Sequence, residues 1–386
     1  MGRNDVNESS NMIKAGITGQ SGFIGTHLYN HLGLREDVER IPFEDDYFKD
    51  ESKLQNFVSK CHVIVHLAAL NRHHDPQRIY ETNIQLVKQL TQACEATNST
   101  PHILFSSSTQ EERDNAYGNS KKEGRKLFEQ WAEKNNAQFT GFVIPNVFGP
   151  FGHPYYNSFI ATFCHQLTHG EQPQVDKDNE VKLIYVGELV QTIINCIAPG
   201  SPLRAPGSPL KVPYTKAIKV SEVLSLLESY KSNYFEQGII PDLTDDFERN
   251  LFNTFVCYID HEDFFPFHLK LNTDNRGSFV ETVKEKNGGQ VSFSTTKPGI
   301  TRGNHYHTRK AERFAVIKGR ARIELRRIGT DEVLSFELDG NQPSFVDMPI
   351  WYTHNITNIG DDDLYTIFWI SEFFDPNDPD TFYEEV

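Results

Sequence analysis

Apolar strand patterns alternate with amphipathic helical patterns along the first two thirds of the chain. The segments "MIKAGITG" (12–19), "CHVIVHLAA" (61–69) and "HILFSSS" (102–108) are short apolar runs typical of buried strands. Helical periodicity follows, as in residues 80–97 and 118–135. Because parallel strands need a crossover connection, this alternation predicts a doubly wound parallel α/β sheet with helices on both faces.

The pattern changes after residue 260. Helical periodicity ends, and short stretches of alternating apolar and polar residues replace it, such as "ERFAVIKG", "RARIELRR" and "LYTIFWI". Many short strands separated by turn residues predict a β-sandwich or barrel. We therefore predict a polar N-terminal extension at residues 1–11, an α/β domain at 12–259, and an all-β domain at 260–386.

Composition narrows the classes of partner and the compartment. The 386 residues carry a formal net charge of −15, so no basic excess is available to displace the counterions of a nucleic acid. No apolar run reaches the length of a membrane-spanning helix. The five cysteines are dispersed without CxxC spacing, which indicates reduced thiols rather than disulfides or a thiolate metal site. We expect a cytoplasmic protein without a nucleic-acid partner and without membrane insertion.

A glycine-rich turn follows the first predicted strand. In "TGQSGFIG", Gly19, Gly22 and Gly25 recur every three residues between a strand and a helix. The first glycine permits a tight turn, the second lets the backbone approach a pyrophosphate, and the third lets helix and strand pack closely. Such a turn binds dinucleotides in Rossmann-type folds, although glycine-rich turns are also common without this role.

A tyrosine and a lysine in "YGNSK" lie four residues apart. Tyr117 and Lys121 therefore share one face of the predicted helix, where the ammonium group would favour the phenolate and make the phenol a better proton donor. The serines of "FSSS" end the preceding strand, at the carboxyl edge where open α/β sheets bind ligands. An isolated Tyr/Lys pair is more often an exposed helix face, but the glycine turn and the serines favour a catalytic site here.

With these segments the chain resembles the extended short-chain dehydrogenase/reductase family. The matching stretches also include "HLAA" after a middle strand, "ETNIQLV" and "PNVFGP". The resemblance implies that Tyr117 donates a proton to a carbonyl oxygen, Lys121 tunes Tyr117 and holds the nicotinamide ribose, and Ser108 hydrogen-bonds the same oxygen. Only eight residues separate Ser108 from Tyr117, so Ser106 and Ser107 stay open as alternatives.

The same resemblance implies contacts with a coenzyme and a substrate. Acids in "PFEDDYF" end the second strand, where an NADP enzyme normally has arginine, so Glu44 or Asp45 could bind an NAD ribose, although Arg40 is nearby. The expected coenzyme-binding residues are Gly19, Gly22, Phe23, Ile24, Gly25, Leu67, Ala68 and Lys121. The candidate substrate-binding residues are Arg72, Asn146, Asn157 and Ser158.

Residues 299–319 have the spacing of a metal site. His305 and His307 share a face of a strand because side chains alternate, and Glu312 follows after a turn. His354 comes later, in "PIWYTHNITN". Three imidazoles and a carboxylate suit Zn²⁺ and could hold Mn, Fe or Ni. An isolated HxH pair is more often two exposed histidines, but the glutamate and the later histidine make a metal site the better interpretation.

This metal-site pattern resembles the two cupin motifs. The glycine-framed first motif is complete, and the second is matched at Pro349, His354 and Asn358, with Trp351 where that motif has glycine. If four protein groups bind Zn²⁺ tetrahedrally, no coordination position stays open and the site would be structural. The resemblance implies a small jelly-roll barrel whose metal ligands are His305, His307, Glu312 and His354.

A keto group connects the two predicted sites chemically. A carbonyl acidifies the hydrogens on its neighbouring carbons, so a proton can be removed and returned on the opposite face before the carbonyl is reduced. Over nearly its whole length the chain resembles the bifunctional UDP-sugar reductase/epimerases of capsular polysaccharide precursor synthesis. That resemblance rests on stretches such as "IVHLA", "YYNSFIATFC", "KPGITRGNHYH" and "FDPNDPDTFYEEV".

The whole-chain resemblance implies a two-step reaction. The cupin domain would epimerise C3 of a UDP-4-keto-6-deoxy-N-acetylhexosamine, and the dehydrogenase domain would reduce C4 with NADPH. The product would be UDP-2-acetamido-2,6-dideoxy-L-talose, in the UDP-N-acetyl-L-fucosamine pathway for capsule or O-antigen. The resemblance also implies zinc and a homo-oligomer, either a dimer or a tetramer.

Two other functions stay open. A one-step NAD(P)H-dependent 4-keto-sugar reductase would use the cupin domain only as a zinc-stabilised dimerisation module, which the apparently saturated metal site favours. A nucleotide-sugar-binding regulator without catalysis would have no need of the intact Tyr117/Lys121 pair, which speaks against it.

Overall fold

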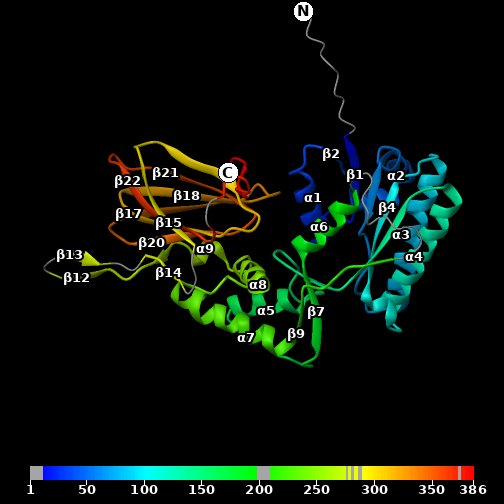
Figure 1. Ribbon diagram of the computed structural model, residues 1–386, viewed down its shortest axis with the longest axis horizontal. Coiled ribbons are helices and arrows are strands. Elements are labelled where there is room, and N and C mark those ends of the chain that lie inside the picture. Colours follow the sequence, from blue (N-terminus) through cyan, green and yellow to red (C-terminus); the bar gives the residue numbers. More distant parts are fainter. Residues whose placement is uncertain (1–11, 198–208, 275–276, 280–281, 286–288, 373–374) are drawn as a thin grey trace, which may run out of the picture. The chain divides into compact units, whose positions relative to one another are not determined.

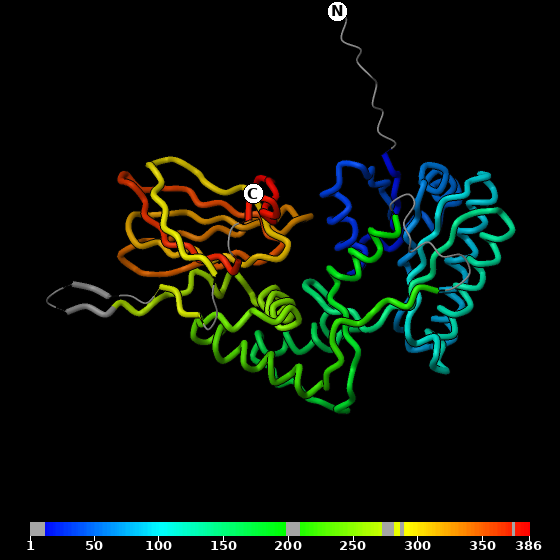
Figure 2. Tube along the Cα trace, viewed as in Figure 1, coloured from blue at the N-terminus to red at the C-terminus, as the bar shows by residue number. Residues whose placement is uncertain are grey.

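The computed structural model describes residues 12–197, 209–274, 277–279, 282–285, 289–372 and 375–386. The described residues form two compact units, one within Met1–Phe148 and Val181–Ala217 and the other within Gly149–Glu180 and Ile218–Val386. The chain leaves the first unit after residue 148, returns at 181 and leaves again after 217 (Figure 2). The domain boundary at residue 260 stays a prediction.

The first unit is built on a parallel sheet (Figure 1). Among the described strands the order is β2-β1-β3-β4-β5-β8, and all neighbours run parallel. Helices α1 and α6 cover one face, and α2, α3 and α4 cover the other. The predicted doubly wound sheet is therefore confirmed. The bounds are β1 Ile13–Thr18, α1 Phe23–Leu32, β2 Val38–Ile41, α2 Glu51–Val58, β3 Val63–His66, α3 Pro76–Ala96, β4 His102–Ser108, α4 Ala116–Asn135, β5 Phe139–Ile144, β6 Asn146–Phe148, β7 Glu180–Tyr185, α6 Val186–Ile197, β8 Leu210–Lys211 and β9 Lys216–Lys219.

The strand order reverses between β1 and β3. Strand β2 lies on one side of β1, while β3, β4 and β5 follow on the other. Open α/β sheets bind ligands at the carboxyl ends of the strands beside such a reversal. The glycine turn after β1 and the segment after β3 both lie at this edge, which is therefore where a coenzyme is expected.

Aromatic side chains fill the core between the sheet and helices α2, α3 and α4. Phe43, Phe57, Phe105 and Phe128 are all buried, and the rings of Phe105 and Phe128 are 5.3 Å apart. Full burial of one such side chain stabilises the fold by about 1.5–3 kcal/mol. Because Phe105 lies on β4 and Phe128 on α4, this packing fixes the helix that carries Tyr117 against the strand that ends in the serines.

The second unit combines helices with two antiparallel sheets. Among the described strands the sheet orders are β11-β20-β17-β22-β15 and β19-β18-β21-β16-β23. The bounds are α5 Phe159–Thr168, α7 Val220–Tyr230, β10 Ile239–Ile240, α8 Asp246–Val256, α9 His261–Phe264, β11 Phe267–His268, β12 Asn272–Asp274, β13 Gly277–Phe279, β14 Lys284–Glu285, β15 Gln290–Thr296, β16 Thr301–Tyr306, β17 Glu312–Lys318, β18 Arg320–Arg327, β19 Val333–Asp339, β20 Ser344–Met348, β21 Tyr352–Asn358, β22 Leu364–Ile370 and β23 Phe382–Tyr383.

The two five-stranded sheets enclose one apolar core. Ile323 and Leu325 from the second sheet and Phe345 from the first are fully buried in it. This arrangement confirms the predicted β-sandwich, and the two five-stranded sheets are hereafter called the barrel; the short helix α9 lies inside the range that was predicted to be all-β. None of the helices that the structure describes combines the length and apolar character needed to cross a bilayer.

A buried ion pair fastens the helical part of the second unit to the barrel. Arg313 on β17 donates two hydrogen bonds to Asp347 on β20, from Nε at 2.8 Å and from Nη2 at 2.9 Å. The Tyr234 hydroxyl donates to the same carboxylate at 2.5 Å, and Arg313 Nη1 donates to the Gly238 carbonyl at 2.7 Å. Because Tyr234 and Gly238 lie between α7 and β10, this cluster joins the two parts of the unit.

Candidate functional site

The glycine turn lies between β1 and α1 and packs against the segment after β3. Gly19 has φ +72°, and a Cβ there would lie 2.8 Å from the amide nitrogen of Ala68. A Cβ on Gly25 would lie 2.2 Å from the Gly19 carbonyl oxygen, so only glycine fits at both positions. Gly22 is the N-cap of α1 and has no side chain that could cap the first-turn amides of the helix. These amides can therefore bind a pyrophosphate.

Tyr117 and Lys121 lie one turn apart in the first half of α4. Asn115 caps this helix, because its side chain accepts a hydrogen bond from the Gly118 amide at 2.8 Å. The Lys121 Nζ atom lies 5.6 Å from the centre of the Tyr117 ring. Burial lowers the pKa of Lys121 to about 7. A buried ammonium beside a phenol has the placement needed to stabilise a phenolate.

The three serines at the end of β4 have different partners. Ser106 donates to a main-chain carbonyl of β3 at 3.2 Å, Ser107 donates to the Glu111 carboxylate, and Ser108 accepts from the Gln110 amide at 3.2 Å. Since side chains alternate along a strand, Ser107 faces away from the side that Ser106 and Ser108 share. The assignment of Ser108 to the substrate carbonyl stays a prediction.

Sequence reasoning missed a partly buried ion pair behind these serines. Arg125 on α4 donates to both carboxylate oxygens of Glu111, each at 3.0 Å, and its Nη1 donates to Glu129 at 2.7 Å. Burial alone raises the pKa of the Glu111 carboxyl, but Arg125 and Ser107 lower it below its usual value. The network fixes the link from β4 to α4. Its sequence signal was weak, because Glu111 and Arg125 are fourteen positions apart.

The predicted ribose acids and Arg40 have separate settings. Asp45 accepts a hydrogen bond at 3.2 Å from Ser21, which lies in the glycine turn. The Arg40 guanidinium lies 4.2 Å from the centre of the Tyr29 ring and donates to the Tyr29 carbonyl at 3.1 Å, so it is held against α1. A carboxylate beside the glycine turn repels a 2′-phosphate and can accept a ribose hydroxyl.

The candidate substrate residues are divided between the two units. Arg72 is exposed in the segment after β3, and Asn146 on β6 donates to the Lys182 carbonyl at 3.4 Å. In the second unit Asn157 is exposed, and the Ser158 hydroxyl caps α5. Their roles as substrate contacts stay predictions.

Four side chains converge in the barrel: His305, His307, Glu312 and His354 each offer a ligand atom, and these atoms all lie within 4.8 Å of one another. Strand β16 carries His305 and leads into His307, β17 begins with Glu312, and β21 carries His354. Strand pairing places His305 opposite His354. The Glu312 Oε2 atom lies 3.2 Å from Nε2 of both His307 and His354 and 3.9 Å from Nε2 of His305.

The spacing of these atoms fits one metal ion. Bonds of about 2.0–2.2 Å at tetrahedral angles put ligand atoms about 3.3–3.6 Å apart. Nε2 of His307, Oε2 of Glu312 and Nε2 of His354 are buried, and none has a hydrogen-bond partner among the described residues. Buried polar atoms are normally satisfied, so these three are suited to a ligand that accepts their lone pairs. Imidazole and carboxylate donors make Zn²⁺ a good fit.

Burial and the neighbouring side chains together shift the pKa values of three groups in this cluster, His305, His307 and Glu312. Burial and the neighbouring imidazoles lower the pKa of His305 to about 4. For Glu312, burial alone raises the pKa, but His307 and His354 lower it below the usual range. Both shifts favour the deprotonated forms that bind metals. For His307, burial lowers the pKa, but Glu312 raises it overall, so a proton competes with a metal for this ring.

Main-chain carbonyls orient two of the histidines. The Asp380 carbonyl lies 2.5 Å from Nδ1 of His307, and the Tyr352 carbonyl lies 3.2 Å from Nδ1 of His354. Because a carbonyl can only accept, each ring carries its proton on Nδ1 and directs the Nε2 lone pair toward Glu312. Sequence reasoning missed Asp380 and assigned no role to the C-terminal segment.

Trp351 replaces the glycine of the second cupin motif. Its φ is +63°, a left-handed conformation that glycine adopts without strain and that large side chains rarely adopt. Its amide donates to the His307 carbonyl at 2.8 Å, and its ring stacks on Tyr306. The main chain at this position therefore has a conformation that suits glycine, although the residue is tryptophan.

Comparison with known proteins gives two separate family matches and relatives that match over nearly the full length of the chain. Residues 15–202 match the NAD dependent epimerase/dehydratase family, and residues 272–382 match the polysaccharide biosynthesis C-terminal domain. The chain is 33% identical over 371 residues to UDP-2-acetamido-2,6-beta-L-arabino-hexul-4-ose reductase of Pseudomonas aeruginosa, covering 96% of this chain and 98% of that protein.

Solved structures give the same result. The capsular polysaccharide assembling protein CapF from Staphylococcus aureus is 36% identical with a TM-score of 0.62, covering 97% of this chain and 100% of that one. A second crystal form of that protein is 34% identical with a TM-score of 0.54, covering 96% and 99%. The chain therefore belongs to the NAD dependent epimerase/dehydratase family, among the CapF-like proteins that join this domain to a polysaccharide biosynthesis C-terminal domain.

Proposed function

We propose that the chain is a bifunctional nucleotide-sugar enzyme that acts twice on one 4-keto sugar. The barrel epimerises C3 of a UDP-4-keto-6-deoxy-N-acetylhexosamine, and the dehydrogenase domain then reduces C4 with NADPH. The product is UDP-2-acetamido-2,6-dideoxy-L-talose, in the UDP-N-acetyl-L-fucosamine pathway. The relative from Pseudomonas aeruginosa supports the reductase step, because its name describes a hexul-4-ose reductase.

The observation that carries the reductase step is the placement of Tyr117 beside the buried Lys121. When bound, the coenzyme supplies a hydride to C4. Tyr117 gives its phenolic proton to O4, so hydride and proton together convert the ketone to an alcohol. Lys121 stabilises the phenolate left behind, and Ser108 donates a hydrogen bond to O4 while negative charge develops there.

The convergent donors in the barrel support the epimerase step. A zinc ion held by His305, His307, Glu312 and His354 would supply a Lewis acid, which makes the hydrogen next to a carbonyl more acidic. Inversion at C3 has to precede reduction, because an alcohol at C4 no longer acidifies C3. His305 is the most exposed of the four ligands, with 25% of its side chain accessible, so the sugar approaches from its side.

A second candidate is a one-step reductase whose barrel is a zinc-stabilised dimerisation module. Its support is the number of donors, because His305, His307, Glu312 and His354 can fill a tetrahedral site completely. Both candidates include a homo-oligomer, so subunit number does not separate them.

The coenzyme also has a second candidate. NADPH is what the whole-chain resemblance implies, whereas Asp45 beside Ser21 favours NADH. Initial rates with saturating keto sugar and either coenzyme decide between them. A clear NADH preference overturns the NADPH proposal.

One experiment separates the two candidate functions. The zinc-loaded enzyme is incubated with the 4-keto sugar in deuterated water without coenzyme, and C3 is followed by NMR and mass spectrometry. Deuterium at C3 supports the epimerase. No incorporation into the substrate, with reductase activity intact in the same preparation, refutes the epimerase step and leaves the one-step reductase.

A further inference from the structure

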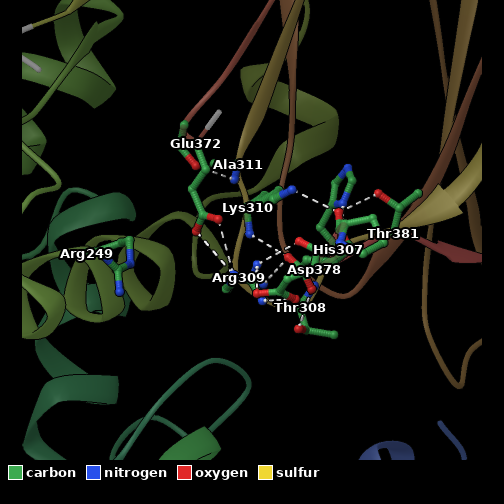
Figure 3. Close-up of polar contacts among 12 residues, drawn as sticks. Arg249, His307, Thr308, Arg309, Lys310, Ala311, Glu372, Asp378 and Thr381 are labelled. Carbon is green, nitrogen blue, oxygen red and sulfur yellow. Dashed lines mark hydrogen bonds and ion pairs between the residues drawn. The ribbon is translucent and has the colours of Figure 1, made fainter. Parts of the chain in front are cut away.

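The C-terminal segment, residues 375–386, contacts the loop that links two of the candidate metal ligands (Figure 3). Part of this segment, "FDPNDPDTFYEEV", contributed to the whole-chain resemblance, but the reductase and epimerase steps give it no role. Its contacts converge on Asp380, which is 4% exposed.

The Asp380 carboxylate holds the loop between His307 and Glu312. One oxygen accepts from the amide and hydroxyl of Thr308, at 3.0 and 2.7 Å. The other accepts from the amides of Arg309 and Lys310, at 3.0 and 3.1 Å. Hydrogen bonds to a charged acceptor are roughly twice as strong as neutral ones. Because this loop connects the two ligands, its position fixes their separation.

The main chain of Asp380 also orients His307. Its carbonyl takes the Nδ1 hydrogen bond, which leaves the Nε2 lone pair directed at Glu312. His354 donates the equivalent Nδ1 hydrogen bond to the carbonyl of Tyr352, only two positions away in its own strand. The orientation of His307 therefore depends on a segment 73 positions away in the sequence.

The same segment binds the strands that carry the other two histidines. Strand β23 pairs with β16, with His305 opposite Tyr383. The Glu384 amide donates to the Asn304 carbonyl at 3.0 Å, and the Thr353 hydroxyl donates to the Glu384 carbonyl. Displacement of this segment would loosen β16, β21 and the loop after His307 together.

We propose that Asp380 is a positioning residue of the metal centre, and that the C-terminal segment and the metal bind cooperatively. The inference rests on the proposed metal binding by the barrel. Outer groups that orient metal ligands typically change metal affinity by about 10–100-fold when removed. By reciprocity, metal binding stabilises the contacts of Asp380 with residues 308–310.

Zinc affinity of the full-length apoprotein tests the proposal, measured by competition with a fluorescent chelator. D380A should bind zinc at least about tenfold more weakly than wild type, and D380N should fall between them because it keeps one acceptor oxygen. The matched control is D378N. Asp378 lies in the same segment but hydrogen-bonds the Arg309 guanidinium and is 66% exposed, so D378N should bind zinc within about twofold of wild type.

A second measurement uses only the wild-type chain, in case D380A does not fold. Hydrogen exchange at the amides of residues 308–310 should slow when zinc is added to the apoprotein. D380N with wild-type zinc affinity, or exchange at 308–310 that is unchanged by zinc, overturns the positioning role. Wild-type protein that binds no zinc instead refutes the proposed metal site itself, so the two failures are distinguishable.

Discussion

The burial of Lys121 predicts an unusual stability profile. Burial lowers the pKa of Lys121 from 10.5 to about 7, and the side chain is 3% exposed. One pKa unit corresponds to about 1.36 kcal/mol, so the charged form is destabilised in the folded state by up to about 5 kcal/mol. Local relaxation relieves part of this cost, so we expect K121M to stabilise the first unit by about 2–3 kcal/mol at pH 6.

The pH dependence of this effect has a definite sign. Below pH 7 the lysine is protonated in both the folded and unfolded states. The full free-energy cost of burying the ammonium group therefore lowers the stability of the folded state. Between pH 7 and 10.5 the unfolded chain binds a proton that the folded chain does not, so the cost falls as pH rises. The advantage of K121M should therefore be largest at pH 6, should be mostly lost by pH 10, and should vanish above pH 10.5.

Urea unfolding without coenzyme measures this effect. A pulse of hydrogen exchange at fixed pH labels the molecules that are unfolded at each urea concentration. Mass spectrometry of peptides from residues 102–135 then reports the unfolding of the first unit separately from that of the barrel. K122M is the matched control, because Lys122 is exposed next to Lys121 and its loss should change stability by less than about 0.5 kcal/mol. Equal stability of K121M and wild type at pH 6, or a gain that persists undiminished at pH 10, refutes the reasoning.

Three further outcomes are expected. Tyr117→Phe should lower the kcat/KM of reduction at least about 100-fold and leave C3 deuterium exchange intact; surviving reduction contradicts the proton-donor assignment. Asp45→Ala should raise the ratio of NADPH to NADH turnover several-fold, because it removes one charge that repels the 2′-phosphate of NADPH. An unchanged ratio would mean that the adenosine ribose binds away from Asp45. Asp347→Ala should destabilise the second unit by about 3–5 kcal/mol in urea, because Arg313 keeps a buried charge without its partner; a loss below about 1 kcal/mol contradicts this.

The sequence was most informative where the chemistry is local. The period of three in Gly19, Gly22 and Gly25 reflects one turn, and the four-residue spacing of Tyr117 and Lys121 reflects one helix face. Helix α3 shows the limit of such patterns. Periodicity predicted a helix over residues 80–97, whereas the helix begins at Pro76 after the Asp75 cap, a signal that periodicity alone does not weigh.

The features that sequence reasoning missed depend on contacts between distant segments. Tyr234 meets Asp347 across 113 positions, and Asp380 meets His307 across 73. Neither pair has a spacing that a helix or strand imposes, because packing of separate elements brings the residues together. The four barrel donors could be proposed from sequence only because His305, His307 and Glu312 lie close along the chain.

The interleaved path of the chain limits how the two proposed reactions can be dissected. A protein that stopped at residue 259 would keep Tyr234 and Phe252 but lose Asp347 and Met348, which line the same cavity. Freshly uncovered apolar surface of this kind favours aggregation. Truncated proteins are therefore unsuited to separating the two proposed reactions. A substitution in the full-length chain, such as Y117F, should remove one reaction and leave the other.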